Sequence, residues 1–240
     1  MKNYLLIFLS ICVFNNLSAQ LFGGQIKSHA DLTSKYPVGS VFCSSGPTVI
    51  VEVTNPTTGK TWMDRNLGAT QVATSSTDAA AYGDLYQWGR RSDGHQCRTS
   101  ATTTTLSSID QPTHGNFILA PITPFDWRSP QNTNLWQGVS GVNNPCPVGY
   151  RIPSETELNN ERLSWSSNDA LGAINSNLKL TLSGYRDLNN GSLINEAAHG
   201  TYWSSTIGSQ FSKNLYLLVN SAYIDNNGRA LGYSVRCIKN

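Results

Sequence analysis

Residues 146–158 read CPVGYRIPSETEL, and this stretch contains the clearest start of a helix in the chain. Ser154 has the small polar side chain that suits a helix N-cap, and Glu157 stands three residues later, where its carboxylate can bond back to the Ser154 amide. Leu158 and Leu163 give the predicted helix a partly apolar face. A functional site built on the carboxylates of the first turn is the alternative, but a capping box explains those acids more simply.

Outside this helix the chain has short β-type segments separated by turns. Residues 48–54 and 60–64 are joined by NPTTG, whose Pro and Gly favour a hairpin. Asn-Gly pairs within residues 187–192 and 225–229 predict two more hairpins. The expected class is α+β, with twisted antiparallel sheets, few short helices and long loops. Further strands are expected over residues 178–185, 201–206, 215–219, 222–225 and 230–238.

Two segments lack a regular pattern. Residues 101–108, ATTTTLSS, are predicted to form a surface loop. Residues 113–144 carry several Pro and Asn and two Trp without clear periodicity, which predicts a long irregular region held by packed aromatic side chains. Long structured loops of this kind often carry function.

The N-terminus predicts export. Residues 1–19 contain one cation, Lys2, followed by an apolar run and a small-residue end at Ala19, which is typical of a cleaved signal peptide. The apolar run is too short for a membrane span, so we expect no membrane insertion after cleavage. We predict an N-terminal extension over residues 20–39 and a single domain over residues 40–240, since no Pro-rich or charged linker divides the rest.

The composition excludes several classes of partner. The chain has 17 Lys plus Arg against 15 Asp plus Glu, so no charge field directs it to nucleic acid, anionic lipid or an acidic polymer. Charged residues make up only 13% of the chain, and the surface is expected to be polar through hydroxyls and amides. Such a surface suits a secreted or cell-surface protein.

Four cysteines follow the predicted signal peptide, and an even number in an exported chain predicts disulfides. Three pairings are possible. We favour Cys146 with Cys237, because each lies in a motif block of the second half of the chain, and Cys43 with Cys97 would then follow. A loop of about 90 residues closed in this way is worth roughly 4 to 5 kcal/mol at most in the chain-entropy model. A zinc site is disfavoured, because the sequence has no CxxC or CxxH spacing.

Six ordered blocks resemble a known family: GKTWMDRNLGA, YGDLYQWGR, NNPCPVGYRIPSETEL, LSGYR, YWSST and GYSVRCI. Together they are similar to the Fibrobacter succinogenes major paralogous domain over roughly residues 40–240. That family is similar in turn to the C-type-lectin-like group, which includes the formylglycine-generating domains. The resemblance implies a twisted antiparallel sheet flanked by short helices, with a long-loop region. It implies no particular activity.

His95 is the strongest candidate for a catalytic residue. It follows Arg90 and Asp93 in GRRSDGHQ, and a histidine beside a carboxylate can perform general acid or base chemistry. The alternative is an ordinary polar turn, which we favour because no nucleophile or second base accompanies the three residues. They are kept as candidate ligand-binding residues.

Tryptophans are the other candidate ligand-binding residues. Trp88, Trp127 and Trp136 lie in or near predicted loops, where an exposed indole could stack on a sugar, although most tryptophans are core residues. The EPN, QPD and WND triplets of calcium-dependent lectins are absent, and residues 187–191 lack the bidentate Glu of a calcium loop. We therefore predict no metal and no cofactor.

The expected function is that of a noncatalytic exported binding or adhesive domain for a glycan, a polysaccharide or a cell-surface protein. The first alternative is a structural envelope component with no small ligand. The second is an enzyme of the formylglycine-generating type, which would need a reactive cysteine pair near the C-terminus. Only Cys237 stands there, so an enzyme is disfavoured.

Overall fold

The computed structural model describes residues 29–43 and 46–240, so the predicted signal peptide over residues 1–19 lies outside the described residues. The protein is 10% helical and 24% strand, which confirms the α+β class with mostly antiparallel sheets. The elements occur in the order α1 (His29–Thr33), β1 (Glu52–Thr54), β2 (Thr61–Met63), η1 (Ala79–Ala81), β3 (Tyr86–Gln87), β4 (Thr102–Thr103), β5 (Phe117–Ile118), β6 (Tyr150–Arg151), α2 (Glu155–Leu163), α3 (Ala170–Asn175), β7 (Tyr185–Arg186), β8 (Leu193–Ile194), β9 (His199–Gly208), β10 (Phe211–Leu218), β11 (Ala222–Asn227), β12 (Gly232–Tyr233) and β13 (Ile238–Lys239).

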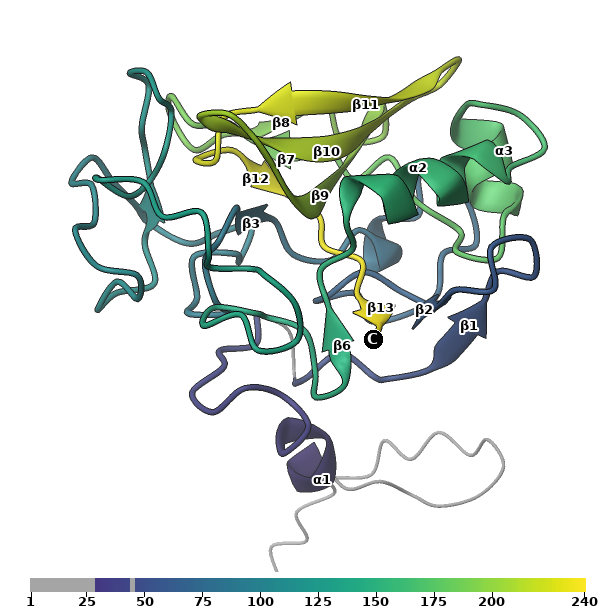
Figure 1. Ribbon diagram of the computed structural model, residues 1–240, viewed down its shortest axis with the longest axis horizontal. Helices are drawn as coiled ribbons and strands as arrows, with labels where there is room; N and C mark the ends of the chain where they lie inside the picture. The colour runs from purple at the N-terminus through teal and green to yellow at the C-terminus, as the bar shows by residue number, and fades with distance from the viewer. Residues whose placement is uncertain (1–28, 44–45) are drawn as a thin grey trace, which may run out of the picture.

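The three longest strands form one antiparallel sheet in the order β11-β10-β9, and α2 lies against it (Figure 1). Side chains alternate between the two faces of a strand. Leu215 and Leu217 of β10 point to the helix side, where they pack in one apolar cluster with Tyr202 of β9 and Leu158 of α2. The alternate residues of β10 and β11 therefore point to the opposite face of the sheet.

Shorter strands surround this sheet. One four-stranded sheet has the order β1-β2-β13-β6, and another has the order β3-β12-β7-β8. Isolated bridges from Gly184 to Gly200 and from Tyr202 to Ser234 connect the second of these sheets to β9. The predicted N-terminal extension reaches the core at Tyr36, whose hydroxyl donates to the Thr48 carbonyl at 2.7 Å.

Two of the three predicted hairpins are confirmed. β1 and β2 pair within residues 48–54 and 60–64, and β7 pairs with β8 around the turn at residues 187–192. The predicted strands over residues 201–206, 215–219 and 222–225 are confirmed by β9, β10 and β11, whereas residues 178–185 and 230–238 are strand only in part.

The prediction of a third hairpin, over residues 225–229, is wrong. After β11 the chain leaves its sheet, because the Ala230 amide donates to the Phe125 carbonyl at 2.8 Å and the Arg229 carbonyl accepts from the Trp88 amide at 2.9 Å. A Cβ on Gly228 would lie 2.6 Å from the Cβ of Phe125. The glycine therefore permits close packing against another segment rather than a turn back along β11.

The predicted capping box of α2 is confirmed. Ser154 Oγ accepts from the Glu157 amide at 3.2 Å, and Glu157 Oε2 accepts from the Ser154 amide at 2.8 Å. The same carboxylate accepts two bonds of 2.8 Å from Arg151, so it also ties β6 to the helix. Leu158 is buried, but Leu163 is 64% exposed, which corrects the predicted apolar face.

Both favoured disulfides, Cys146–Cys237 and Cys43–Cys97, are present. Cys146 and Cys237 belong to the larger hydrophobic core, whereas Cys43 is exposed. Two disulfides fit a protein that folds in an oxidising compartment. Within residues 29–43 and 46–240, every helix is too short or too polar to span a bilayer.

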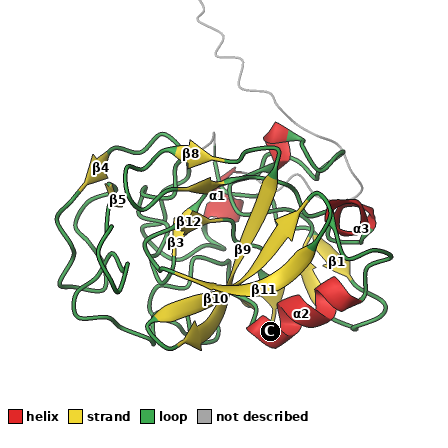
Figure 2. Ribbon diagram, turned by 90° about the horizontal axis from the view of Figure 1, so that it is seen from above, coloured by secondary structure: helices red, strands yellow, loops and turns green. Residues whose placement is uncertain are grey.

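The region over residues 113–144 is irregular, as predicted, and contributes β5 as its strand. Long loops make up the part of the molecule that carries β4 and β5 (Figure 2). Trp127 and Trp136 from this region are buried in the larger core, which confirms that packed aromatic side chains hold it. Residues 101–108 lie mostly at the surface, and β4 within them pairs in parallel with β5.

Candidate functional site

The three candidate tryptophans are core residues, so the prediction of an exposed stacking platform among them is wrong. Trp88, Trp127 and Trp136 each have a relative exposure of 0%. Their indole nitrogens donate to backbone carbonyls, as in the bond of 2.8 Å from Trp88 to Ser204 and the bond of 2.7 Å from Trp127 to Trp88. Burial removes their ring faces from any ligand that approaches from solvent.

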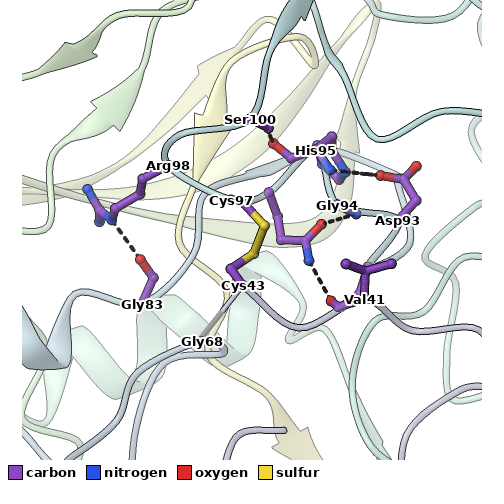
Figure 3. The surroundings of a disulfide bond; sticks show 12 residues. Val41, Cys43, Gly68, Gly83, Asp93, Gly94, His95, Cys97, Arg98 and Ser100 are labelled. Atoms are coloured by element: carbon purple, nitrogen blue, oxygen red, sulfur yellow. Dashed lines mark hydrogen bonds and ion pairs between the residues drawn. A yellow bond between two sulfur atoms is a disulfide. The ribbon is translucent and has the colours of Figure 1, made fainter. Parts of the chain in front are cut away.

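Arg90, Asp93 and His95 do come together, but in the interior. His95 Nδ1 lies 2.6 Å from Asp93 Oδ1 (Figure 3). Its Nε2 accepts from the Gln87 amide at 3.0 Å, so both ring nitrogens are occupied. Arg90 donates to Asp93 Oδ2 at 2.7 Å. Burial, followed by the charge of Arg90, lowers the pKa of His95 to about 4. The ring is therefore neutral at physiological pH and serves as a structural link, as the polar-turn alternative expected.

A different site lies on the face of β10 and β11 opposite α2. A surface cavity of about 540 Å³ opens there, and we call it the tyrosine groove. Segments around β7, β10, β11 and β12 converge on it, together with one residue of the irregular region. Its aromatic walls are formed by Phe125, Tyr185, Phe211, Tyr216, Tyr223 and Tyr233.

Strand alternation accounts for the aromatic walls. Tyr216 of β10 stands directly opposite Tyr223 of β11 in the sheet register, and their rings stack at 5.6 Å between centroids with an interplanar angle of 16°. Tyr185 meets Tyr233 edge to face at 6.0 Å. Tyr223 is 42% exposed, whereas Tyr233 is buried against Trp203. The groove therefore has a fixed aromatic base and one broadly accessible ring.

Five polar residues also line the groove: Asp187, Asn189, Asp225, Asn226 and Asn227. Asp187 Oδ1 accepts from both the backbone and the side-chain amide of Asn189, at 3.1 and 2.8 Å. Asp225 accepts from the Asn226 backbone amide at 2.8 Å and from the Asn227 side chain at 2.9 Å. These local bonds orient the carboxylates without a cation. The Asn226 side chain donates to the Gly208 carbonyl at 3.3 Å, and its buried oxygen accepts no hydrogen bond from the residues that the structure describes.

The Tyr216 hydroxyl keeps its proton at physiological pH. Burial, and then the neighbouring Tyr185, Tyr223 and Asp225, raise the pKa of Tyr216 to about 12. The Tyr216 hydroxyl lies 2.7 Å from His199 Nδ1, which holds the ring in position. The same site thus offers stacking surfaces, hydroxyl donors and carboxylate acceptors.

The sequence contained one signal for this site that composition did not reveal. Tyr223, Asp225 and Asn227 alternate along β11, and residues at such spacing share one face of a strand. The segment at 187–191 is a hairpin turn, as predicted, and in addition places Asp187 and Asn189 at the groove. The approach of Phe125 depends on long-range packing and had no local signal.

Among the residues that the structure describes, no group of three or more His, Cys, Asp or Glu side chains is placed to hold a metal ion. Comparisons with family models, curated proteins and solved structures gave no match to this chain.

Proposed function

We propose that this protein is a noncatalytic exported binding module that holds a glycan in the tyrosine groove. The observation that carries the proposal is the combination of stacked tyrosines and oriented polar side chains in one open cavity. We also propose that the chain has the C-type-lectin-like fold that its resemblance to the Fibrobacter succinogenes major paralogous domain implies. Binding at the groove replaces the earlier expectation of binding through the loop tryptophans.

The aromatic walls support a sugar ligand. A pyranose ring has apolar C–H faces that pack on an aromatic ring, while its hydroxyls need polar partners around the edge. Tyr223 offers an accessible face, and the stacked Tyr216 fixes its orientation. A cavity of about 540 Å³ is within the range of small-molecule sites, roughly 300–1,000 Å³, and accommodates more than one sugar ring.

The polar lining supports the same ligand class. Carboxylates accept hydrogen bonds from sugar hydroxyls, and side-chain amides both donate and accept. Asp187 and Asp225 are already oriented by neighbouring amides, so binding requires little new ordering of these side chains.

Two further observations support binding rather than catalysis. His95, the candidate acid or base, is buried with both nitrogens occupied. All four cysteines in the described part of the chain form disulfides, whereas chemistry of the formylglycine-generating type needs a reactive thiol. The two disulfides also support the proposed export.

The experiment is a glycan and polysaccharide array, followed by titration of the best ligand against Tyr223→Ala. We expect selective binding that survives a metal chelator and weakens about tenfold in the variant, equivalent to about 1.4 kcal/mol of lost stacking. Tyr223→Phe keeps the ring and should retain most of the affinity.

Leu163→Ala is the matched control, because Leu163 is 64% exposed on α2, on the other side of the sheet. It should bind like the unmodified protein. Equal affinity of Tyr223→Ala and the unmodified protein would exclude the tyrosine groove as the binding site. Absence of binding on the whole array would exclude the glycan function.

A further inference from the structure

We propose that the tyrosine groove selects glycans that carry a free amine, so that its ligand is an amino sugar in a de-N-acetylated polysaccharide. This inference rests on the proposed glycan binding and specifies the substrate class. It follows from the charges that line the groove, which are of one sign.

The two carboxylates of the groove have no positive counterpart. Asp187 and Asp225 take part in no ion pair with any residue that the structure describes, and no Lys, Arg or His within those residues lines the groove. Their hydrogen bonds come from neutral amides. A ligand therefore meets two formal negative charges among aromatic walls.

The nearest cations in the sequence are used elsewhere. Arg186 precedes Asp187, but its guanidinium lies over the Phe117 ring at 4.4 Å and donates to the Gly191 carbonyl at 2.8 Å. Arg229 is buried, with its guanidinium over Trp88 at 4.7 Å and 3.4 Å from an oxygen of Asp126. Lys213 on β10 does not line the groove. The fold thus directs two neighbouring arginines away from the carboxylates.

This charge arrangement distinguishes three kinds of sugar. A ligand that covers the groove removes water from Asp187 and Asp225, which is unfavourable unless the ligand supplies compensating charge or hydrogen bonds. An ammonium group supplies both, and it is also attracted to the faces of Tyr216 and Tyr223. A neutral sugar supplies hydrogen bonds alone, and a uronate or a sulfate is repelled.

Free acceptor capacity remains on the carboxylates. An ionised carboxylate has about four lone-pair sites. Asp187 accepts its two bonds from Asn189 on Oδ1, and Asp225 accepts one bond on each oxygen. Each carboxylate can therefore accept further N–H bonds from an ammonium group.

The test is calorimetric titration with a glucosamine tetramer and its fully N-acetylated counterpart, which share one backbone. Measurements at mildly acidic pH keep the amine charged. We expect the amine tetramer to bind at least tenfold more tightly and to lose affinity as salt is added, because screening weakens charge attraction. The double substitution Asp187→Asn and Asp225→Asn should abolish the difference between the tetramers.

Asp169→Asn is the matched control. Asp169 caps α3 outside the groove, and asparagine caps a helix about as well as aspartate, so this variant should keep the full preference. Equal or tighter binding of the N-acetylated tetramer would overturn amine selection while leaving glycan binding intact. Binding of a lysine-rich peptide but neither tetramer, abolished by the double substitution, would overturn the amino-sugar proposal in favour of a protein partner.

Discussion

Replacing Cys146 and Cys237 together by alanine is expected to lower the free energy of unfolding by about 2–5 kcal/mol. The disulfide closes a loop with a sequence separation of 91 residues, and its loss increases the conformational freedom of the unfolded chain. Both cysteines are also buried, with exposures of 1% and 0%, so the substitution removes packed sulfur atoms from the larger core. Urea denaturation of the variant and the unmodified protein measures the loss.

The second disulfide provides the control for this prediction. Cys43–Cys97 has a sequence separation of 54 residues. The chain-entropy model therefore predicts that it stabilises the folded protein by only about 0.5 kcal/mol less than Cys146–Cys237 does. Cys43 is exposed, however, and less packing is lost there. The variant with Cys43 and Cys97 replaced by alanine should be the more stable of the two. The reverse order would show that the core position of Cys146–Cys237 adds no stability.

Asp84→Asn is expected to stabilise the protein at neutral and alkaline pH by about 1–4 kcal/mol, with no gain below about pH 4. Asp84 is buried and forms no ion pair within the described residues, although Arg98 exerts a favourable charge on it from a distance. Burial raises the pKa of Asp84 from 3.8 to about 7. A Cβ on Gly68 would lie 2.2 Å from its carboxyl carbon, so a close backbone contact confines the group.

The sign of the pH dependence follows from this raised pKa. The folded protein holds the proton of Asp84 between about pH 4 and pH 7, where the unfolded chain has released it. The stabilisation from this proton is therefore complete below about pH 4 and is lost as the pH rises through about 7. Asparagine is neutral throughout and avoids this loss.

Denaturation at several pH values checks the prediction. The difference between Asp84→Asn and the unmodified protein should grow as the pH rises and level off above about pH 7. Asp169→Asn should show no gain at neutral pH, because hydrogen bonds from Ser167 and the Gly172 amide lower the pKa of Asp169. If Asp84→Asn increased the free energy of unfolding equally at every pH, the result would contradict the claim that burial raises the pKa of Asp84.

Local features of the sequence predicted local structure well. The capping box at Ser154 and Glu157 needs only neighbouring residues, and it formed as expected. The turn at residues 187–192 also depends on its own Asn-Gly pair. By contrast, the pair at Asn227 and Gly228 has the same local signal, but packing against Phe125 determined its path.

Most of the candidate site could not be predicted from local sequence patterns, because it also depends on long-range packing. Trp127 and Trp136 were expected in or near exposed loops, yet the irregular region folds inward and buries them in the larger core, where Trp88 joins them. The tyrosine groove combines β7, β10, β11 and β12 with Phe125, so its parts meet only in the folded chain. Alternation along β11 identified one face of a strand, but not which face a helix would cover.

Backbone amide NMR during titration of the oxidised protein with the best array ligand tests the central claim most directly. Binding in the tyrosine groove should shift the amides of residues 185–191 and 223–228 and that of Phe125, with little change in α2. Shifts confined to α2, or to the loops over residues 101–116, would contradict the assignment of the groove as the binding site.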